Sequence, residues 1–94
     1  MYRKMIINLS SVKTTEELHK TLKEKLEFPE FYGMNWSAFW DAITGLIELP
    51  DELIIEGWEK MENRLPDDSR KMKQLFDNFN KQFPDLKCNI IYKR

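Results

Sequence analysis

Cysteine and histidine are almost absent from this chain of 94 residues, which contains one of each, Cys88 and His19. A single cysteine cannot form an internal disulfide, so nothing in the sequence requires an oxidising compartment. Neither residue belongs to a spacing typical of a metal site or of a cysteine–histidine nucleophile. We therefore predict no metal ligand and no catalytic residue. Cys88 is expected to be an inert strand residue, and His19 to be partly buried or solvent-facing on a helix.

Glycine is also scarce, and Gly33, Gly45 and Gly57 are too far apart to form a phosphate-binding loop. Carboxylate pairs are plentiful, but on an acidic surface they carry no specificity for acid–base catalysis. The sequence therefore indicates no cofactor and no enzyme activity. No apolar run approaches the ~20 residues that cross a membrane, and the N-terminus lacks the features of a secretion signal. We expect a cytoplasmic protein that contacts no membrane.

Positive charge is nearly missing from residues 27–62. This segment has one base, Lys60, and nine acids, giving a net charge of −8, whereas the other 58 residues sum to +7. A segregated acidic surface attracts a cationic partner, although a solvated surface without function is an alternative. Nucleic-acid binding is not predicted, because the main aromatic cluster lies in the acidic segment. A nucleic-acid surface would interleave aromatic and basic residues.

Short apolar segments bounded by turn residues predict three buried strands, at residues 5–9, 53–55 and 88–92. The connections between them carry helical periodicity, and such connections favour parallel pairing of the strands. With 94 residues there is room for one domain. We therefore predict a single α/β domain over residues 1–94, with a three-stranded parallel sheet packed with about four helices.

Helix boundaries follow from capping residues and prolines. Thr14 and Glu17 fit a capping box at the start of the first helix, and Pro29 ends that region. Asn35 caps a second helix, whose left-handed C-terminal residue is predicted to be Gly45. A short helix is expected over 58–65, followed after a proline by a longer helix whose cap is Asp67, Asp68 or Ser69.

The second helix lies within the stretch FYGMNWSAFWDAITG, and six of the 12 aromatic residues fall between positions 28 and 40. One apolar stripe is formed at helical spacing by Trp36, Phe39, Trp40 and Ile43. The opposite side carries a polar stripe of Ser37, Asp41, Thr44 and Glu48. We interpret the aromatic residues as a rigid platform that presents Asp41 to a protein partner. The alternative is that they are simply core and that Asp41 is a surface charge.

The stretch FPEFYGMNWSAFWDAITG, followed by Leu49 and Pro50, resembles the barstar family of bacterial intracellular ribonuclease inhibitors. The shared residues, in register with the predicted helix, are Pro29, Glu30, Tyr32, Gly33, Asn35, Ala38, Trp40, Asp41, Thr44 and Gly45. Weaker similarity extends over the whole chain. The resemblance implies a three-stranded parallel sheet with helices, in agreement with the prediction made above from periodicity.

The resemblance also implies a function. The second helix and its preceding loop would block the cationic active site of a small basic bacterial ribonuclease, with Asp41 in place of an RNA phosphate. The free protein is expected to be a monomer. The predicted partner-binding residues are Phe31, Gly33, Asn35, Ser37, Ala38, Asp41, Thr44, Gly45, Leu46, Glu48 and Asn78.

Four of these positions depart from the family. Ser37 stands where barstar has a second interface aspartate, Phe31 replaces an interface tyrosine, Leu46 replaces a tryptophan, and Asn78 replaces a glutamate. Most of the changes weaken electrostatic complementarity to that particular nuclease. An interaction or regulatory module of the same fold, with a partner that is not a nuclease, is therefore the alternative hypothesis.

Overall fold

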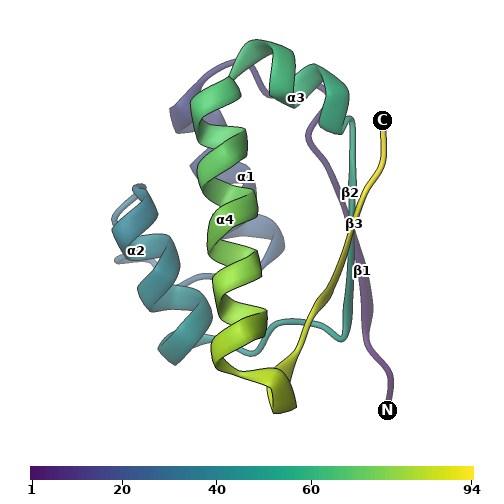
Figure 1. Ribbon diagram of the computed structural model, residues 1–94. Coiled ribbons are helices and arrows are strands. Elements are labelled where there is room, and N and C mark those ends of the chain that lie inside the picture. The colour runs from purple at the N-terminus through teal and green to yellow at the C-terminus, as the bar shows by residue number, and fades with distance from the viewer.

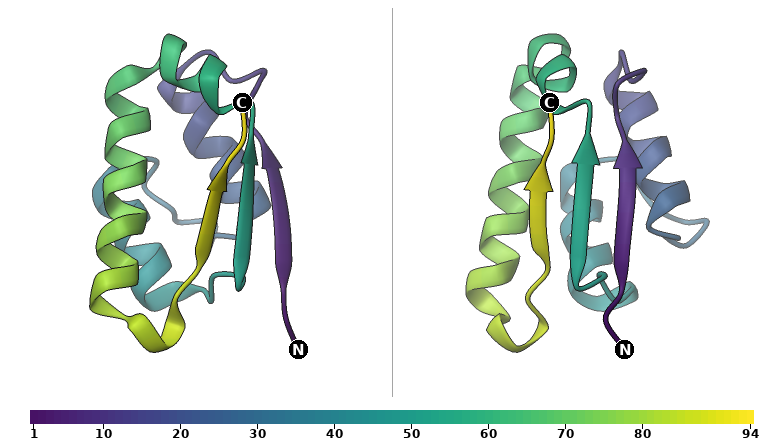
Figure 2. Two further views of the ribbon diagram at one scale, coloured as in Figure 1. Left: turned by 45° about the vertical axis from the view of Figure 1, so that its right-hand side comes forward. Right: turned by 90° about the vertical axis from the view of Figure 1, so that its right-hand side faces the viewer.

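The three apolar segments form a parallel sheet in the order β1–β2–β3, in a computed structural model that describes residues 1–94. The strands are β1 (Lys4–Asn8), β2 (Glu52–Glu56) and β3 (Asn89–Tyr92). All three run in the same direction (Figure 2), with Ile6, Ile54 and Ile91 in register across the sheet. The predicted three-stranded parallel sheet is confirmed.

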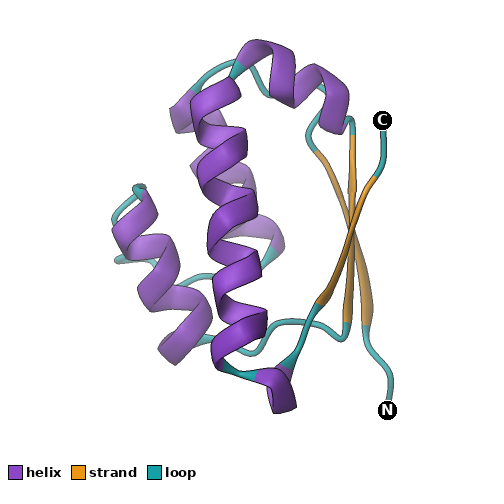
Figure 3. Ribbon diagram, in the orientation of Figure 1, coloured by secondary structure: helices purple, strands orange, loops and turns teal.

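Helices cover only one face of this sheet. α1 (Thr15–Lys25), α2 (Trp36–Asp41) and α4 (Pro66–Gln82) lie on the same side, and α3 (Trp58–Arg64) sits at one end of the strands (Figures 1 and 3). The number of α-helices matches the prediction. Because parallel sheets are usually covered on both faces, the bare face is unusual. Both chain ends lie on the sheet side of the molecule, whereas α2 lies farthest from the sheet (Figure 1).

Alternation along the strands explains the one-sided cover. Ile7, Leu53 and Ile55 point toward the helices and are fully buried. Their neighbours on the bare face are mostly polar or charged, and Ile6 is 53% exposed. Ile54, on the bare face of the central strand, is also buried, at 7% exposure, so β2 is a continuous apolar run and not an alternating one.

The connection from β2 to α3 depends on Gly57, which has a φ of +73°. A Cβ atom at this position would lie 2.6 Å from the backbone nitrogen of Ser10. Only glycine satisfies both the left-handed conformation and this close approach. The predicted end of the second strand near Gly57 is confirmed.

The predicted capping box is present at α1. The hydroxyl of Thr14 accepts the backbone N–H of Glu17, while the Glu17 carboxylate accepts the backbone N–H of Thr14 at 3.0 Å. By contrast, the predicted cap of α4 is wrong. That helix begins at Pro66, and the hydroxyl of Ser69 donates to the Leu65 carbonyl. Proline is tolerated in the first turn because its missing N–H has no partner there.

The prediction for the end of the second helix is also wrong. Gly45 does not have a left-handed conformation; it lies in a π-helical turn, η1, over Ala42–Leu46. The N–H of Ile47 donates to the Ala42 carbonyl at 3.1 Å, a wider turn than in an α-helix, and Ile47 itself is extended. Glu48 therefore lies beyond the helical residues, and the polar stripe that begins on α2 ends at Thr44 in η1.

Candidate protein-binding surface

The loop before α2 is held by hydrogen bonds from its own residues. Asn35 caps the helix as predicted, since its Oδ1 accepts the N–H of Ala38 at 2.8 Å. Its Nδ2 donates to the Gly33 carbonyl at 3.1 Å. A Cβ atom on Gly33 would lie 3.2 Å from the Cβ of Ala38. These contacts bring Gly33, Asn35 and Ala38 together at the start of α2.

Two apolar side chains flank α2 and are open to solvent. Phe31, in the loop, is 75% exposed, and Leu46, at the end of η1, is 47% exposed. They are among the few large hydrophobic residues that the fold leaves uncovered. Exposed aromatic and aliphatic side chains at the two ends of a polar helix face are suited to contact with a protein partner.

Asp41 lies at the C-terminal end of α2, exposed and without an ion-pair partner in the chain. It lines a groove of about 340 Å³ between α2 and α4, together with Ser37 from its own helix and Lys71 from α4. The apolar walls are supplied by Trp36, Trp40 and Leu75. Ser37 and Asp41 thus share one depression, and two of its three apolar lining residues are tryptophans.

Thr44 and Glu48 line a different hollow of about 340 Å³ at the far end of the surface, beside Ile43 and Phe79. The hydroxyl of Thr44 donates to the carbonyl of Trp40 at 2.7 Å, so its proton is used within the helix. Gly45 is exposed next to Thr44. Asn78, on α4, is half-buried and lines neither of these two hollows, and no hydrogen bond or ion pair links it to the other predicted residues.

An aromatic cluster supports this surface from behind. Phe39 is fully buried, and its ring centroid lies 5.2 Å from Trp36, 5.4 Å from Phe76 and 5.9 Å from Phe28. All three pairs are edge-to-face, the arrangement that aromatic rings prefer. Trp36 and Trp40 are half-buried, and both pack against the hydrophobic core and line the groove. Aromatic residues are concentrated in this stretch because some of them form the core behind the surface and others line its groove.

The burial of His19 differs from the prediction made from the sequence. The residue is completely buried, not partly exposed, and its ring packs against Trp36 at 4.5 Å and Tyr32 at 5.8 Å between centroids. Its Nδ1 is 2.8 Å from the Tyr32 hydroxyl. The signal was present, since His19, Leu22 and Leu26 share the i, i+3, i+7 spacing of one helix face.

The remaining candidates for chemistry are inert or absent. Cys88 is fully buried, and burial raises the pKa of its thiol to about 12, so no thiolate forms near neutral pH. No group of three or more histidine, cysteine or acidic side chains is arranged to hold a metal ion. None of the helices is long and apolar enough to span a membrane.

Comparison with known proteins agrees with this geometry. The family model described as Barstar (barnase inhibitor) matches residues 2–92. A Bacillus subtilis (strain 168) protein named "Putative ribonuclease inhibitor YrdF" is 44% identical over 57 residues, which cover 61% of this chain and 63% of that relative. The match therefore spans less than two thirds of the relative's length. The family model covers almost the whole sequence, and the chain belongs to the barstar family.

Proposed function

We propose that this protein is an intracellular inhibitor of a small basic bacterial ribonuclease and has no catalytic activity of its own. Residues 1–94 act as one barstar-like domain and as a monomer in the cytoplasm. α2 and its preceding loop enter the active site of the nuclease and exclude RNA. The contact surface comprises the residues expected from the sequence, namely Phe31, Gly33, Asn35, Ser37, Ala38, Asp41, Thr44, Gly45, Leu46, Glu48 and Asn78.

The observation that carries the proposal is the state of Asp41. Its carboxylate is exposed in the groove, without an ion pair in the free protein. An unpaired carboxylate beside two indole rings is suited to a cation that loses its water on contact. A ribonuclease active site supplies such cations because it binds RNA phosphates.

The distribution of charge supports the same partner. The segment over residues 27–62 carries a net charge of −8 and contains the loop, α2 and η1, together with β2 and α3, on which four of its nine acids lie. A field of this sign accelerates encounter with a basic protein and repels RNA. The name of the Bacillus subtilis relative, a ribonuclease inhibitor, points to the same class of partner.

A second candidate function is favoured by a specific observation. Ser37 is neutral and exposed beside Asp41, and Lys71 introduces a positive charge into the same groove. These two features reduce the negative potential that a strongly cationic active site would require. A regulatory or interaction module with a partner that is not a nuclease is the alternative that they support.

The decisive experiment is an inhibition assay. RNA cleavage is measured for a panel of small basic bacterial ribonucleases, barnase included, while the protein is titrated into each reaction. We expect stoichiometric inhibition of at least one enzyme. Asp41→Asn is the matched control, because it keeps the shape of the side chain and removes its charge. Full activity of every enzyme at an excess of the protein would favour the alternative, and affinity capture from the source cell would then identify the partner.

A further inference from the structure

The buried His19 reaches the binding loop through a chain of hydrogen bonds. Its Nδ1 lies 2.8 Å from the hydroxyl of Tyr32, and this hydroxyl lies 3.4 Å from the carbonyl oxygen of Asn35. The same carbonyl accepts the N–H of Phe39 at 2.9 Å. A side chain of α1 is thus connected, through one tyrosine, to the residue that caps α2.

The network determines which nitrogen of His19 carries the proton. If Nδ1 carries it, Nδ1–H donates to the Tyr32 oxygen, and the Tyr32 hydroxyl donates to the Asn35 carbonyl. Only the Nε2 lone pair then lacks a partner. With the other tautomer, the Tyr32 hydroxyl donates to His19, Nε2–H becomes an orphaned buried donor and the Asn35 carbonyl loses one hydrogen bond. Orphaned buried donors are rarer than orphaned acceptors, so we assign the proton to Nδ1.

The loop depends on such support because it contains little regular structure. Residues 26–35 separate α1 from α2, and Met34 has a φ of +55°, a conformation that non-glycine residues seldom adopt. Tyr32 is the buried residue at the centre of this segment, with its ring 4.7 Å from that of Phe28. Its neighbours in sequence, Phe31 and Gly33, are exposed. Fixing Tyr32 therefore fixes both neighbours.

We propose that His19 and Tyr32 are positioning residues, which hold the loop in its binding conformation without touching the partner. The ordering of the loop does not depend on the proposed function; only the expected effect on binding rests on it. A loop that is ordered before contact avoids the entropic cost of ordering it in the complex. Loss of the network should therefore lower the fraction of molecules that are competent to bind.

Three variants test the proposal. Tyr32→Phe keeps the ring and removes the hydroxyl. His19→Leu and His19→Asn are close in size, but only asparagine places a polar atom where Nδ1 stands. His19→Asn should therefore retain the hydrogen bond to Tyr32 that His19→Leu loses. The two histidine variants create similar cavities, so a difference between them reports the hydrogen bond and not packing.

The first measurement is amide hydrogen exchange in the free protein. The amides of Ala38 and Phe39 are hydrogen-bonded to Asn35, and that of Tyr32 to Pro29. In Tyr32→Phe and His19→Leu, these amides should exchange about tenfold faster relative to those of β2, because one lost hydrogen bond opens the loop locally. In His19→Asn they should stay close to the parent. Equal acceleration at all sites, or none at the loop, would overturn the proposal.

The second measurement is the rate of association with barnase, the enzyme named in the family description. We expect association to slow about tenfold in Tyr32→Phe and His19→Leu and to recover in His19→Asn. If the parent protein does not bind barnase, this probe fails to support the proposed function, while the exchange data still decide the role of His19 and Tyr32. If barnase binds all three variants like the parent, the positioning role is refuted.

Discussion

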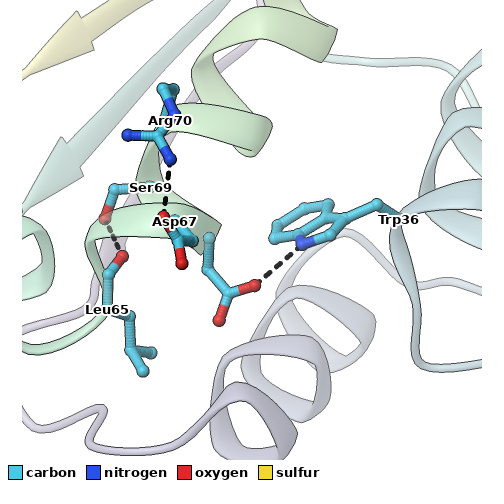
Figure 4. Close-up of polar contacts among 6 residues, drawn as sticks. Trp36, Leu65, Asp67, Ser69 and Arg70 are labelled. Atoms are coloured by element: carbon cyan, nitrogen blue, oxygen red, sulfur yellow. Dashed lines mark hydrogen bonds and ion pairs between the residues drawn. The ribbon is translucent and has the colours of Figure 1, made fainter.

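The indole of Trp36, at the start of α2, donates a hydrogen bond from Nε1 to Oδ1 of Asp68 in the first turn of α4, at 2.9 Å (Figure 4). The other oxygen of Asp68 accepts the hydroxyl of Thr15, the first residue of α1. One carboxylate therefore ties the N-terminal ends of three helices together. The orientation of α2, and so of Asp41, depends on a residue that lies outside the proposed contact surface.

This relationship leads to a first prediction. Trp36→Phe keeps an aromatic ring but removes the donor to Asp68, and should lower the free energy of unfolding by about 1.5–3 kcal/mol, the contribution of a hydrogen bond to a charged group. Urea unfolding provides the measurement. Trp40→Phe is the control, since the indole N–H of Trp40 makes no hydrogen bond within the chain, and should cost less. Equal losses for the two variants would mean that ring packing alone matters.

The second prediction concerns Asp41. Asp41→Ala should weaken binding to the nuclease by about 2–5 kcal/mol, mainly through faster dissociation, because the partner's cations are left unpaired; complexes of this family have themselves contributed to that range. The melting temperature should barely change, since the side chain is exposed and forms no ion pair. Surface plasmon resonance and thermal melting together provide the check. An alanine variant that binds like the parent would remove Asp41 from the contact surface.

The third prediction concerns salt. Raising the ionic strength from about 10 mM to about 150 mM shortens the Debye length from roughly 30 Å to 8 Å. The association rate with a basic nuclease should fall steeply, because the −8 segment over residues 27–62 steers the encounter. Dissociation should change little. Stopped-flow association measured across this range tests the idea, and a flat rate would mean that the charge segregation has no role in binding.

The fourth prediction uses the departure at Ser37, which is exposed one helical turn before Asp41 in the same groove. Ser37→Asp places a carboxylate in the first turn of α2, where negative charge is favourable by about 0.3–1 kcal/mol. Stability should therefore hold or rise slightly. Against barnase, affinity should increase at least about tenfold, equivalent to ~1.4 kcal/mol.

Ser37→Asn is the uncharged control for that substitution. Weaker binding of Ser37→Asp to the physiological partner would show that this partner presents a neutral or acidic surface opposite residue 37. If the affinities for barnase and for the physiological partner both stay unchanged, the face of α2 and η1 from Ser37 to Thr44 is not the contact surface.

The fifth prediction concerns pH. Burial lowers the pKa of His19 below its ordinary 6.5, and the neighbouring Asp68 opposes this only in part. The unfolded chain therefore binds the proton more readily than the folded one. Stability should be complete above about pH 6.5 and fall as pH decreases toward the folded pKa, by at most ~1.4 kcal/mol per pH unit. Urea unfolding between pH 8 and pH 5 measures the slope, which should disappear in His19→Asn.

The fold could be predicted from the sequence because its signals are local. The short apolar strand segments, the capping box at Thr14 and Glu17, and the cap at Asn35 each depend on residues close together in the chain. Gly45 was misassigned for the same reason. A glycine after an apolar helical stripe usually ends an α-helix, whereas here the π-helical turn continues to Leu46. Sequence spacing does not distinguish these two endings.

The arrangement behind the candidate surface was harder to predict, because it depends on contacts between distant segments. His19 and Tyr32 are 13 positions apart, and Trp36 and Asp68 are 32 apart. Neither the sequence around His19 nor the sequence around Trp36 indicates which distant residue the side chain contacts. The four departures from the family pattern were readable in the sequence, but only the structure shows that Lys71 shares the groove of Ser37 and Asp41.

The bare face of the sheet has a practical consequence. Met1 and Arg94 lie on the sheet side, and α2 lies on the opposite side of the helical layer (Figure 1). Met1, however, lines the same hollow as Thr44 and Glu48, so an attachment there would lie beside the proposed contact surface. An affinity tag or a biotin attached at Arg94 would emerge away from α2. The protein can therefore be immobilised on a sensor chip, or fused to a reporter enzyme, through its C-terminus while the Asp41 groove stays accessible to a captured nuclease.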